Sequence, residues 1–503
     1  MLAKVKSIAL QGLEGFLIDV EADVSAGIPS LEIVGLPDIS IREAKERVKS
    51  AIKNSGYEFL SRKIIINLAP ASLRKEGSSF DLAIAVSILV AQEIIKKIDI
   101  QNIVFLGEIS LNGDIHPIHG ALPMCIEAIK KGIKKVILSY QNAEEAGIIK
   151  GISIIPVNNL KEVIKYLNNE LDIPNYQANT SKKANNINNL DFAEVKGQEN
   201  IKRALEIAAS GGHNCLLIGS PGSGKTMMAK RLPTILPDLS FEESLQITKI
   251  HSIAGRLEKN PLITKRPFRS PHHTVTSASL VGGGKTPKPG EISLSHYGVL
   301  FLDELPEFNK SALEVLRGPL EDRKITISRV NASLTYPCEF MLIASMNPCP
   351  CGYYGSDKNC QCSPEMIRRY INKLSGPLLD RIDIQVRVSS VDYSKICNYE
   401  KAETSSQIKK RVDIARDIQR YRYKADGILS NSELTPQLIE KYCILDVQCQ
   451  KIMENAFKRL GLSVRAYSRI LKVARTISDL DNSDNIKQQH LLEAIQYRSL
   501  DKK

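Results

Sequence analysis

The 503-residue sequence lacks any apolar run long enough to cross a bilayer as a helix. Its first residues also lack the hydrophobic region of a secretory signal peptide. We therefore expect a cytoplasmic protein with no membrane partner. In that compartment the ten cysteines do not indicate a disulfide framework, but four of them fall close together and need a separate explanation.

The composition is otherwise that of an ordinary globular protein, with 43% hydrophobic and 25% charged residues. The chain is too long for a single hydrophobic core, so several domains are expected. A net charge of +12 permits a polyanionic partner such as nucleic acid. A lysine-rich surface also serves solubility alone, so the charge does not by itself select a function.

The clearest motif is a glycine-rich stretch that matches G-x-x-x-x-G-K-[ST] at every fixed position. An apolar segment, 215–218, precedes it as a predicted strand, and residues 227–232 follow with helix-forming composition. In such a loop the backbone N–H groups turn toward phosphate oxygens, Lys225 reaches the β- and γ-phosphates, and Thr226 ligates Mg²⁺. The motif comprises Gly219, Ser220, Pro221, Gly222, Ser223, Gly224, Lys225 and Thr226. It predicts binding of ATP with Mg²⁺.

Two later strands end in polar residues that suit the same site. The buried segment 299–302 leads into Asp303 and Glu304, which is the Walker B pattern. Asp303 would hold Mg²⁺, and Glu304 would orient and deprotonate the attacking water. The next apolar strand, 340–345, is followed by Asn347, whose amide could hydrogen-bond the γ-phosphate or that water. These residues predict ATP hydrolysis.

Two Cys-x-Cys pairs lie directly after this strand, in the segment 349–362. They consist of Cys349 with Cys351, and of Cys360 with Cys362. Four thiolates in two close pairs can surround a tetrahedral Zn²⁺. The composition alone leaves an iron–sulfur cluster open, and the other alternative is four free thiols. The expected task of the metal is to fix a long loop beside the ATP site. By contrast, His272 and His273 are neighbours on an extended segment, should point to opposite faces, and are not expected to share an ion.

The N-terminal region alternates short apolar runs with helical patterns, which predicts an α+β or α/β domain. Segments 75–85 and 107–132 resemble the proteolytic domain of the Lon family, which has the fold of ribosomal protein S5 domain 2. Ser79 occupies the position of the Lon serine, but Leu122 occupies that of its lysine base. Without that base the serine is not activated, so the resemblance implies an inert scaffold or docking domain.

The order of the motifs resembles the AAA+ ATPases, and within them the magnesium chelatase and MCM helicase branch. Across essentially the whole chain the sequence is similar to the ComM/YifB family. This resemblance implies that Asn347 is sensor 1, that Arg381 is an arginine finger acting on a neighbouring subunit, and that Arg465 is sensor 2. Arg469, one turn later, is the less favoured alternative for sensor 2. An arginine acting in trans implies a homo-oligomeric ring, and the family resemblance implies a hexamer.

Two basic insertions are expected to contact nucleic acid. Alternating residues around a short tip predict a β-hairpin over 324–336, and in the MCM-like branch such a hairpin carries a basic residue into the central pore, here Arg329. The Gly/Pro-rich loop 280–290 carries Lys285 and Lys288. Basic side chains on pore loops suit contact with a phosphate backbone rather than reading of bases, although exposed turns carry similar charges for solvation alone.

Together these features predict an α/β protein with four parts. They are a Lon-like N-terminal domain (1–167), a flexible linker (168–190), a P-loop AAA+ core (191–395) and a C-terminal helical lid (396–503). We expect an ATP-driven DNA motor acting on single-stranded, forked or branched DNA, and the family resemblance implies branch migration in recombination or natural transformation. The alternatives are a chelatase- or chaperone-like remodeller of a protein partner and, less favoured because of Leu122, an ATP-dependent protease.

Overall fold

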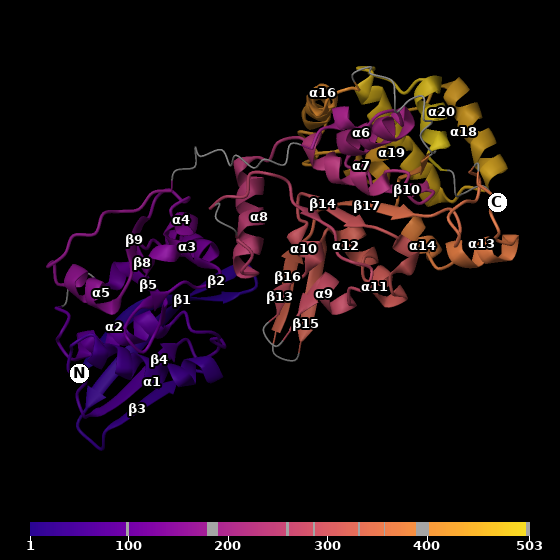
Figure 1. The fold of residues 1–503 in the computed structure, drawn as a ribbon. Coiled ribbons are helices and arrows are strands. Elements are labelled where there is room, and N and C mark those ends of the chain that lie inside the picture. Colours follow the sequence, from indigo (N-terminus) through magenta and orange to yellow (C-terminus); the bar gives the residue numbers. More distant parts are fainter. Residues whose placement is uncertain are drawn as a thin grey trace. The chain divides into compact units, whose positions relative to one another are not determined.

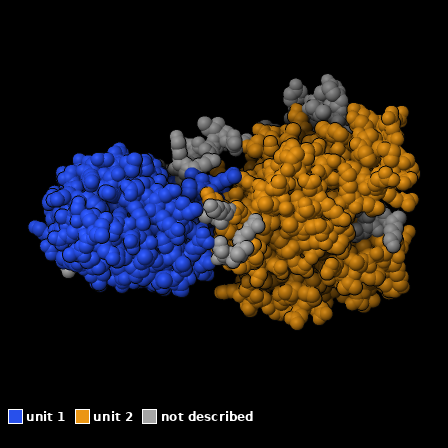
Figure 2. All heavy atoms as spheres, turned by 90° about the horizontal axis from the view of Figure 1, so that it is seen from below, with its two compact units in different colours: residues 1–185, 244–263 blue, residues 186–243, 264–503 orange. Residues whose placement is uncertain are grey.

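The computed structural model describes residues 1–96, 100–178, 190–257, 261–284, 287–329, 332–356, 358–388 and 402–498. The chain forms two compact units, shown in different colours in Figure 2. Unit 1 contains residues 1–185 and 244–263, and unit 2 contains residues 186–243 and 264–503. No helix among the described residues is both long and apolar enough to cross a membrane.

Unit 1 is built on a seven-stranded mixed sheet with the order β3-β4-β2-β1-β5-β8-β9. The half around β1, β2 and β4 is antiparallel, whereas β5, β8 and β9 pair in parallel (Figure 1). The strands are β1 (Leu2–Gln11), β2 (Glu14–Ser25), β3 (Ser30–Val34), β4 (Lys63–Ala69), β5 (Ile103–Leu106), β8 (Lys135–Ser139) and β9 (Ser153–Val157), with a separate two-stranded ribbon of β6 (Glu108–Ile109) and β7 (Ile115–His116).

Helices and a segment from later in the chain complete unit 1. Helix α2 (Asp81–Ala91) is buried on all sides, so an almost entirely apolar sequence is required there. Helix α8 (Phe241–Ile253) belongs to unit 1 from Ser244 onward, and its Ser252 hydroxyl donates to the buried carboxylate of Glu145. The remaining helices are α1 (Ile39–Asn54), α3 (Ala121–Lys130), α4 (Ala143–Ala146) and α5 (Leu160–Leu167).

Unit 2 contains a five-stranded parallel sheet with the order β11-β14-β17-β10-β18. Its strands are β10 (Cys215–Gly219), β11 (Phe268–Arg269), β14 (Val299–Leu302), β17 (Met341–Met346) and β18 (Ile384–Val388). Strand β10 therefore lies between two strands that come more than a hundred residues later. Four-residue apolar runs suffice for these strands because parallel sheets are covered on both faces, and β14 is buried along its whole length.

Short helices and two ribbons surround this sheet. The ribbons pair β12 (Gly282–Gly283) with β13 (Lys288–Pro289), and β15 (Lys324–Arg329) with β16 (Ala332–Pro337). The helices are α6 (Glu199–Gly211), α7 (Lys225–Arg231), α9 (Ser277–Val281), α10 (Glu291–Leu294), α11 (Lys310–Glu314), α12 (Arg317–Asp322), α13 (Pro364–Ile371) and α14 (Gly376–Leu379).

The C-terminal part of unit 2 is helical. It comprises α16 (Ser405–Arg422), α17 (Pro436–Tyr442), α18 (Val447–Leu460), α19 (Val464–Leu480) and α20 (Gln488–Gln496). Side-chain caps begin these helices where the sequence places Ser, Thr or Asp; for example, Ser463 accepts a hydrogen bond from the N–H of Ala466 at the start of α19. The apolar faces of α16 and α19 continue the core that covers α6 and the sheet.

A buried ionic cluster joins this helical part to the sheet. Asp383, directly before β18, is paired with Arg469 of α19 and lies 3.2 Å from Nδ1 of His213. Burial alone would raise the pKa of Asp383, but the charge of Arg469 and the hydrogen bond from His213 outweigh burial and hold the pKa well below its usual range. The cluster therefore requires an ionised carboxylate at neutral pH.

The predicted fold class is confirmed, and the predicted strands and helices lie within a few residues of the observed ones. The two units differ from the four predicted parts in two respects. Residues 244–263, which belong to the predicted core, pack with unit 1, and the rest of the core forms a single unit with the helical part. Within the predicted linker, the N–H of Tyr176 and that of Ala178 bond to unit 1 carbonyls, and residues 179–189 lie outside the described residues.

We predict that Asp383→Asn lowers the free energy of unfolding at pH 7 by about 3 kcal/mol, because it removes the charge that pairs with Arg469. A folded pKa below the unfolded value means that this stabilisation is fully present above about pH 4 and is lost only in stronger acid. Urea unfolding should therefore give a constant difference from wild type between pH 5 and 8. As a control, Asp417→Asn, which breaks the exposed pair with Arg420, should change stability by less than about 1 kcal/mol. If the difference in unfolding free energy between wild type and Asp383→Asn vanished by pH 5, the low pKa inferred for Asp383 would be contradicted.

Candidate functional site

The glycine-rich loop joins β10 to α7 and has the backbone that its sequence requires. Gly222 and Gly224 adopt φ values of +75° and +83°, a region that favours glycine. The buried hydroxyl of Ser223 has no hydrogen-bond partner among the described residues. An unpartnered hydroxyl within a glycine loop fits a site that is completed by an anionic ligand.

Lys225 lies at the start of α7 and points back into the loop. Its Nζ atom donates to the carbonyl oxygens of Gly219 at 2.7 Å and Ser220 at 2.9 Å. Burial lowers the pKa of Lys225, and the charges of Asp303 and Glu304 partly offset this effect. A phosphate would offer the ammonium group a charged acceptor in place of neutral carbonyls, so the residues present fit ATP.

The magnesium ligands predicted from sequence meet directly. The Thr226 hydroxyl donates to Oδ2 of Asp303 over 2.7 Å. The other carboxylate oxygen of Asp303 accepts from the Ser345 hydroxyl and, at 3.1 Å, from the N–H of Glu304. Thr226 and Asp303 could therefore hold Mg²⁺ between them, with the carboxylate oriented by Ser345. No motif pointed to Ser345, and its hydroxyl in an otherwise apolar strand was the available signal.

Glu304 follows β14 in a left-handed conformation, with φ of 54°. Such a conformation is strained for a residue with a Cβ, and it turns the carboxylate away from the strand. Its side chain is 57% exposed, and Oε2 lies 3.7 Å from Nδ1 of His273. An exposed carboxylate at this edge could accept a proton from water. His273 was missed as a neighbour of Glu304 because 30 residues separate them.

The expectation that His272 and His273 point to opposite faces was wrong. Their ring centroids lie 4.0 Å apart in a tilted stack, because the segment turns at this point rather than running straight. Neither residue belongs to a potential metal-binding group among the described residues.

Asn347 reaches the same site from the end of β17. Its Oδ1 atom lies 3.3 Å from Nζ of Lys225. This contact follows from the register, since Ile218 is paired with Met346 in the parallel ladder. The amide is therefore adjacent to the lysine that would hold the terminal phosphates.

The four predicted cysteines converge. Every pair of Sγ atoms among Cys349, Cys351, Cys360 and Cys362 lies within 4.8 Å, and three pairs measure 3.4, 3.7 and 3.6 Å. Zn–S bonds of about 2.3 Å in a tetrahedron place the sulfur atoms about 3.8 Å apart. The spacing thus fits one ion held by four thiolates. A multinuclear iron–sulfur cluster would separate the thiolates further, because they would bind two or more irons instead of one ion.

The electrostatics of the cluster also favour a cation. Backbone N–H groups of Tyr353 and Gln361 lower the pKa of Cys351 to about 6. A backbone N–H of Cys362 lowers the pKa of Cys360, but desolvation and the neighbouring sulfurs outweigh it and raise that pKa to about 12. The surroundings thus favour ionisation of one cysteine, whereas each further thiolate would be repelled by the first. A divalent cation bound among the four sulfur atoms would compensate this repulsion.

The cysteine loop contacts the phosphate loop directly. A Cβ atom on Gly352 would lie 2.6 Å from Cδ of Pro221 and 3.8 Å from the side-chain carbon of Asn347. Because Gly352 follows Cys351, fixing the cysteines also fixes the surface on which Pro221 rests. A metal held by the four cysteines would thus support the predicted ATP site without entering it.

Arg381 lies just after α14 and is held within its own chain. One terminal nitrogen is paired with Glu321, another donates to the carbonyl of Pro377 at 2.8 Å, and Nε is buried without a partner among the described residues. Among the described residues, no hydrogen bond or ion pair joins Arg381 to the phosphate loop. Within its own chain, Arg381 thus contacts Glu321 and Pro377 rather than the phosphate loop.

The two arginines considered for sensor 2 have different surroundings. Arg465, in the first turn of α19, is exposed, whereas Arg469 is bound to Asp383. Asp383 precedes β18 and so lies at the amino-terminal edge of the parallel sheet, opposite the phosphate loop. Arg469 therefore has a structural role, and Arg465 is the arginine that is available for a ligand.

The two basic insertions pack together. The hydroxyl of Tyr336 in β16 donates to the carbonyl of Pro287 at 3.2 Å, and Figure 1 shows β13 beside β15 and β16. Lys288 is exposed on β13. Arg329 ends β15, but its side chain lies outside the described residues, as does Lys285 entirely. The hairpin predicted from alternation is confirmed.

The Lon-like positions carry no dyad. Ser79 is buried, and its carbonyl accepts from the N–H of Gly107. Leu122 is fully buried on α3, and its backbone N–H donates to Glu145 at 2.9 Å. An apolar side chain cannot act as a base, so the structure offers no activated serine at this position.

Comparisons with known proteins agree with this architecture. The magnesium chelatase subunit ChlI family matches residues 191–396, a second ChlI family matches 20–142, and the ChlI C-terminal family matches 402–498. Lon protease 2 of Bacillus subtilis is 34% identical over 181 residues, which cover 32% of this chain and 32% of that protein.

The full-length relatives include two that carry distinct names. YifB of Salmonella typhimurium is 44% identical over 504 residues, covering 100% of this chain and 98% of the relative. The competence protein ComM of Haemophilus influenzae is 41% identical over 504 residues, covering 99% and 98%. The chain therefore belongs to the YifB/ComM family of magnesium chelatase-like AAA+ proteins.

Proposed function

We propose that this protein is a ring-forming motor that couples ATP hydrolysis to movement along DNA. The observation that carries the proposal is the meeting of Lys225, Thr226, Asp303 and Asn347 at one edge of the sheet, in the same unit as a projecting basic hairpin. The family match supports ATP and Mg²⁺ as cofactors. The name of the ComM relative connects the family with competence, which is consistent with DNA as the partner and with a role in recombination.

Each residue of the ATP site has one proposed task. The loop 219–226 and Lys225 bind and orient the phosphates, while Thr226 and Asp303 hold Mg²⁺, which would neutralise charge on them. Glu304 takes the proton from the attacking water, and Asn347 positions that water or the γ-phosphate. Ser345 keeps the carboxylate of Asp303 oriented toward Thr226.

We predict that Glu304→Gln lowers kcat for ATP about 10²–10⁴-fold with ATP affinity retained, because only proton transfer is removed. Lys225→Ala should instead abolish tight ATP binding. Turnover and fluorescent-nucleotide titration separate the two effects. Glu307→Gln is the matched control, since Glu307 lies in the same strand-end segment but is paired with Lys373, and it should keep turnover. A Glu304→Gln enzyme with normal kcat would refute the assignment of the base.

Ring formation is proposed from the arginines. Arg381 would leave Glu321 and stabilise transition-state charge in the ATP site of an adjacent subunit, and Arg465 would contact phosphates. A hexamer is the family-based expectation. Arg381 is partly exposed, so an adjacent subunit could reach it, whereas Arg465 would act on the ATP site of its own chain.

We predict that Arg381→Ala binds ATP but turns over roughly 100-fold more slowly. Mixing it with Lys225→Ala should recover part of the activity, because some interfaces then combine an intact phosphate loop with an intact arginine. Arg369→Ala, which removes an exposed arginine of α13, should retain full activity. Loss of ATP binding in Arg381→Ala, or no recovery on mixing, would contradict action in trans.

DNA contact is proposed for Arg329, Lys285 and Lys288. The packing of Tyr336 on Pro287 joins the two insertions, so their basic residues would act as one phosphate-binding surface. Such contacts carry no sequence information, which suits a motor that moves along any DNA.

We predict that single-stranded or forked DNA stimulates ATP turnover, and that Arg329→Ala or Lys288→Ala weakens DNA binding. The slope of log K against log salt should fall by about 1 for each phosphate interaction that a variant removes. Lys324→Ala, at the exposed base of the same hairpin, is the control and should bind as wild type does. If DNA neither binds nor stimulates turnover, the motor is not a DNA motor.

That outcome would favour the second candidate, a chelatase- or chaperone-like remodeller of a protein partner. The matches to chelatase subunit ChlI support it. In this case a protein partner, rather than DNA, would stimulate the same ATP site.

A structural Zn²⁺ is proposed for Cys349, Cys351, Cys360 and Cys362. We predict about one equivalent of zinc per chain by elemental analysis, and its loss in Cys351→Ser or Cys360→Ser. Because the loop rests on Pro221, these variants should also bind ATP more weakly. Cys338→Ala removes a buried thiol outside the cluster and should retain the metal. Less than half an equivalent in wild type would indicate free thiols, and iron in place of zinc would change the identity of the metal.

A further inference from the structure

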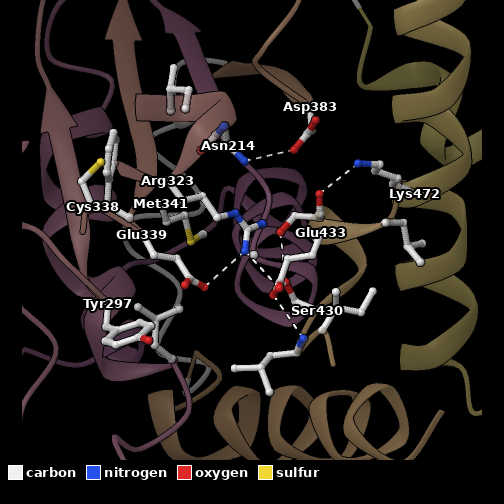
Figure 3. A pocket seen from close by; sticks show the side chains of 18 of the residues that line it. Asn214, Tyr297, Arg323, Cys338, Glu339, Met341, Asp383, Ser430, Glu433 and Lys472 are labelled. Atoms are coloured by element: carbon white, nitrogen blue, oxygen red, sulfur yellow. Dashed lines mark hydrogen bonds and ion pairs between the residues drawn. The ribbon is translucent and has the colours of Figure 1, made fainter. Parts of the chain in front are cut away.

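A second cavity lies in unit 2, at the edge of the sheet opposite the phosphate loop. Its walls include Asn214, Gly298, Met341 and Asp383, which stand at or just before the first residues of β10, β14, β17 and β18. Its volume is about 610 Å³, within the range of small-ligand sites. Figure 3 shows side chains from the sheet and from the helical part pointing into it. None of the residues proposed to bind or hydrolyse ATP lines this cavity, although Glu321, the partner of Arg381, does.

Most of the charges in this cavity neutralise one another. Arg323 is held between Glu339 and Glu433, at 3.4 and 3.0 Å (Figure 3). Arg266 is paired with Glu243 at 3.6 Å, and Asp383 with Arg469. These acids are therefore committed to their own cations.

Two cations remain for which no ion pair is formed among the described residues. Both Nε and Nη2 of Arg416 donate to the carbonyl of Ala209, at 3.2 and 3.0 Å. Lys472 donates to the carbonyl of Ser432 at 2.9 Å (Figure 3). An ammonium group has three donors and a guanidinium has five, so both side chains keep donors for a further acceptor.

Burial makes the positive charge of these two side chains costly. It lowers the pKa of Arg416 to about 10, and nearby Arg266 adds to this effect. Burial likewise lowers the pKa of Lys472 to about 8, although Asp383 opposes the shift. Both side chains are half-buried, and cations removed from water are normally compensated by an anion. Glu433 and Glu339 act on Arg416 from a distance, but no acid among the described residues forms an ion pair with Arg416 or Lys472.

Hydroxyl groups complete the arrangement. A Cβ atom on Gly212 would lie 3.0 Å from Oγ of Ser432, 3.2 Å from Oγ of Ser430 and 3.3 Å from Nη2 of Arg416. Two hydroxyls and a guanidinium thus surround one point of the wall. The Ser430 hydroxyl donates to Oε1 of Glu433 at 2.9 Å and lies 3.0 Å from Oγ of Ser432, so Ser432 is the residue whose hydroxyl can donate to a ligand. Lys472 is hydrogen-bonded to the backbone carbonyl of the same Ser432. Clustered hydroxyl, guanidinium and ammonium donors are the groups that bind phosphate oxygens.

We propose that this cavity binds a small phosphorylated ligand through Arg416, Lys472 and Ser432. The ligand would lie between the sheet and helices α16 and α19, and binding would stabilise the helical part against the sheet. The site is separate from the ATP site, since it lies at the opposite edge of the parallel strands.

The test uses the full-length Lys225→Ala protein, in which the ATP site is disabled, with pyrophosphate as the probe. Isothermal titration calorimetry should show one pyrophosphate site per chain. Thermal unfolding should show that pyrophosphate raises the unfolding temperature. Lys472→Gln should weaken pyrophosphate binding roughly tenfold or more, and Arg416→Gln by a similar factor. Lys410→Gln is the matched control, because this exposed lysine of α16 lies outside the cavity, and it should leave binding unchanged.

Three outcomes would overturn the proposal. The first is that Lys225→Ala does not bind pyrophosphate. The second is that neither Lys472→Gln nor Arg416→Gln changes the affinity for pyrophosphate. The third is that these two variants lose binding of single-stranded DNA although no pyrophosphate site is found. Orthophosphate titrated in parallel distinguishes a site for free phosphate from one for larger phosphorylated molecules. If Arg416→Gln fails to fold, Lys472→Gln decides, because Lys472 makes a single hydrogen bond to a backbone carbonyl.

Discussion

The parallel pairing of β10 with β17, and of β17 with β14, is the constraint on which the rest of unit 2 depends. Parallel strands bring their carboxyl ends to one edge, so the residues that follow these three strands become neighbours. Lys225, Asp303 and Asn347 are separated by up to 122 positions in the chain, yet they lie within hydrogen-bonding reach of one another or of Thr226. The packing of the buried apolar strands determines their register, and the register determines which side chains meet at the ATP site.

The loops at that edge are supported from outside the sheet. Ser345 orients Asp303, and Gly352 brings the cysteine loop against Pro221. With a metal bound by its four thiolates, the cysteine loop would have little freedom and would provide a rigid surface under a phosphate loop that is rich in glycine. The same unit carries the hairpin β15–β16, which begins two residues after α12 and leads into β17. A displacement of β17 would therefore reach both Asn347 and the hairpin.

The opposite edge of the sheet is where the C-terminal helical part is attached to the strands. Asp383, His213 and Arg469 join α19 to the strands, and this ionic cluster lies beside a cavity that holds two half-buried cations without ion-pair partners among the described residues. One end of each strand thus carries the nucleotide chemistry, while the other carries the junction with the helical part. This arrangement would let a ligand at the junction influence how the helical part responds to hydrolysis.

The sequence alone determined the local features, because each depends on residues close together in the chain. Alternation predicted the hairpin, apolar runs predicted β10, β14 and β17, and the glycine pattern identified the phosphate loop. The four cysteines, which lie within one loop, were visible in the same way. Only the tertiary structure decided that Ser345 orients Asp303, that His273 faces Glu304, that Arg469 is committed to Asp383, and that residues 244–263 pack with unit 1. Ser345 and Asp303 are 42 positions apart, and Arg469 and Asp383 are 86 positions apart. Ser252, which attaches the segment 244–263 to unit 1, is 107 positions from its partner Glu145. Their partners are chosen by packing and charge after the sheets have formed, so no local pattern could specify them.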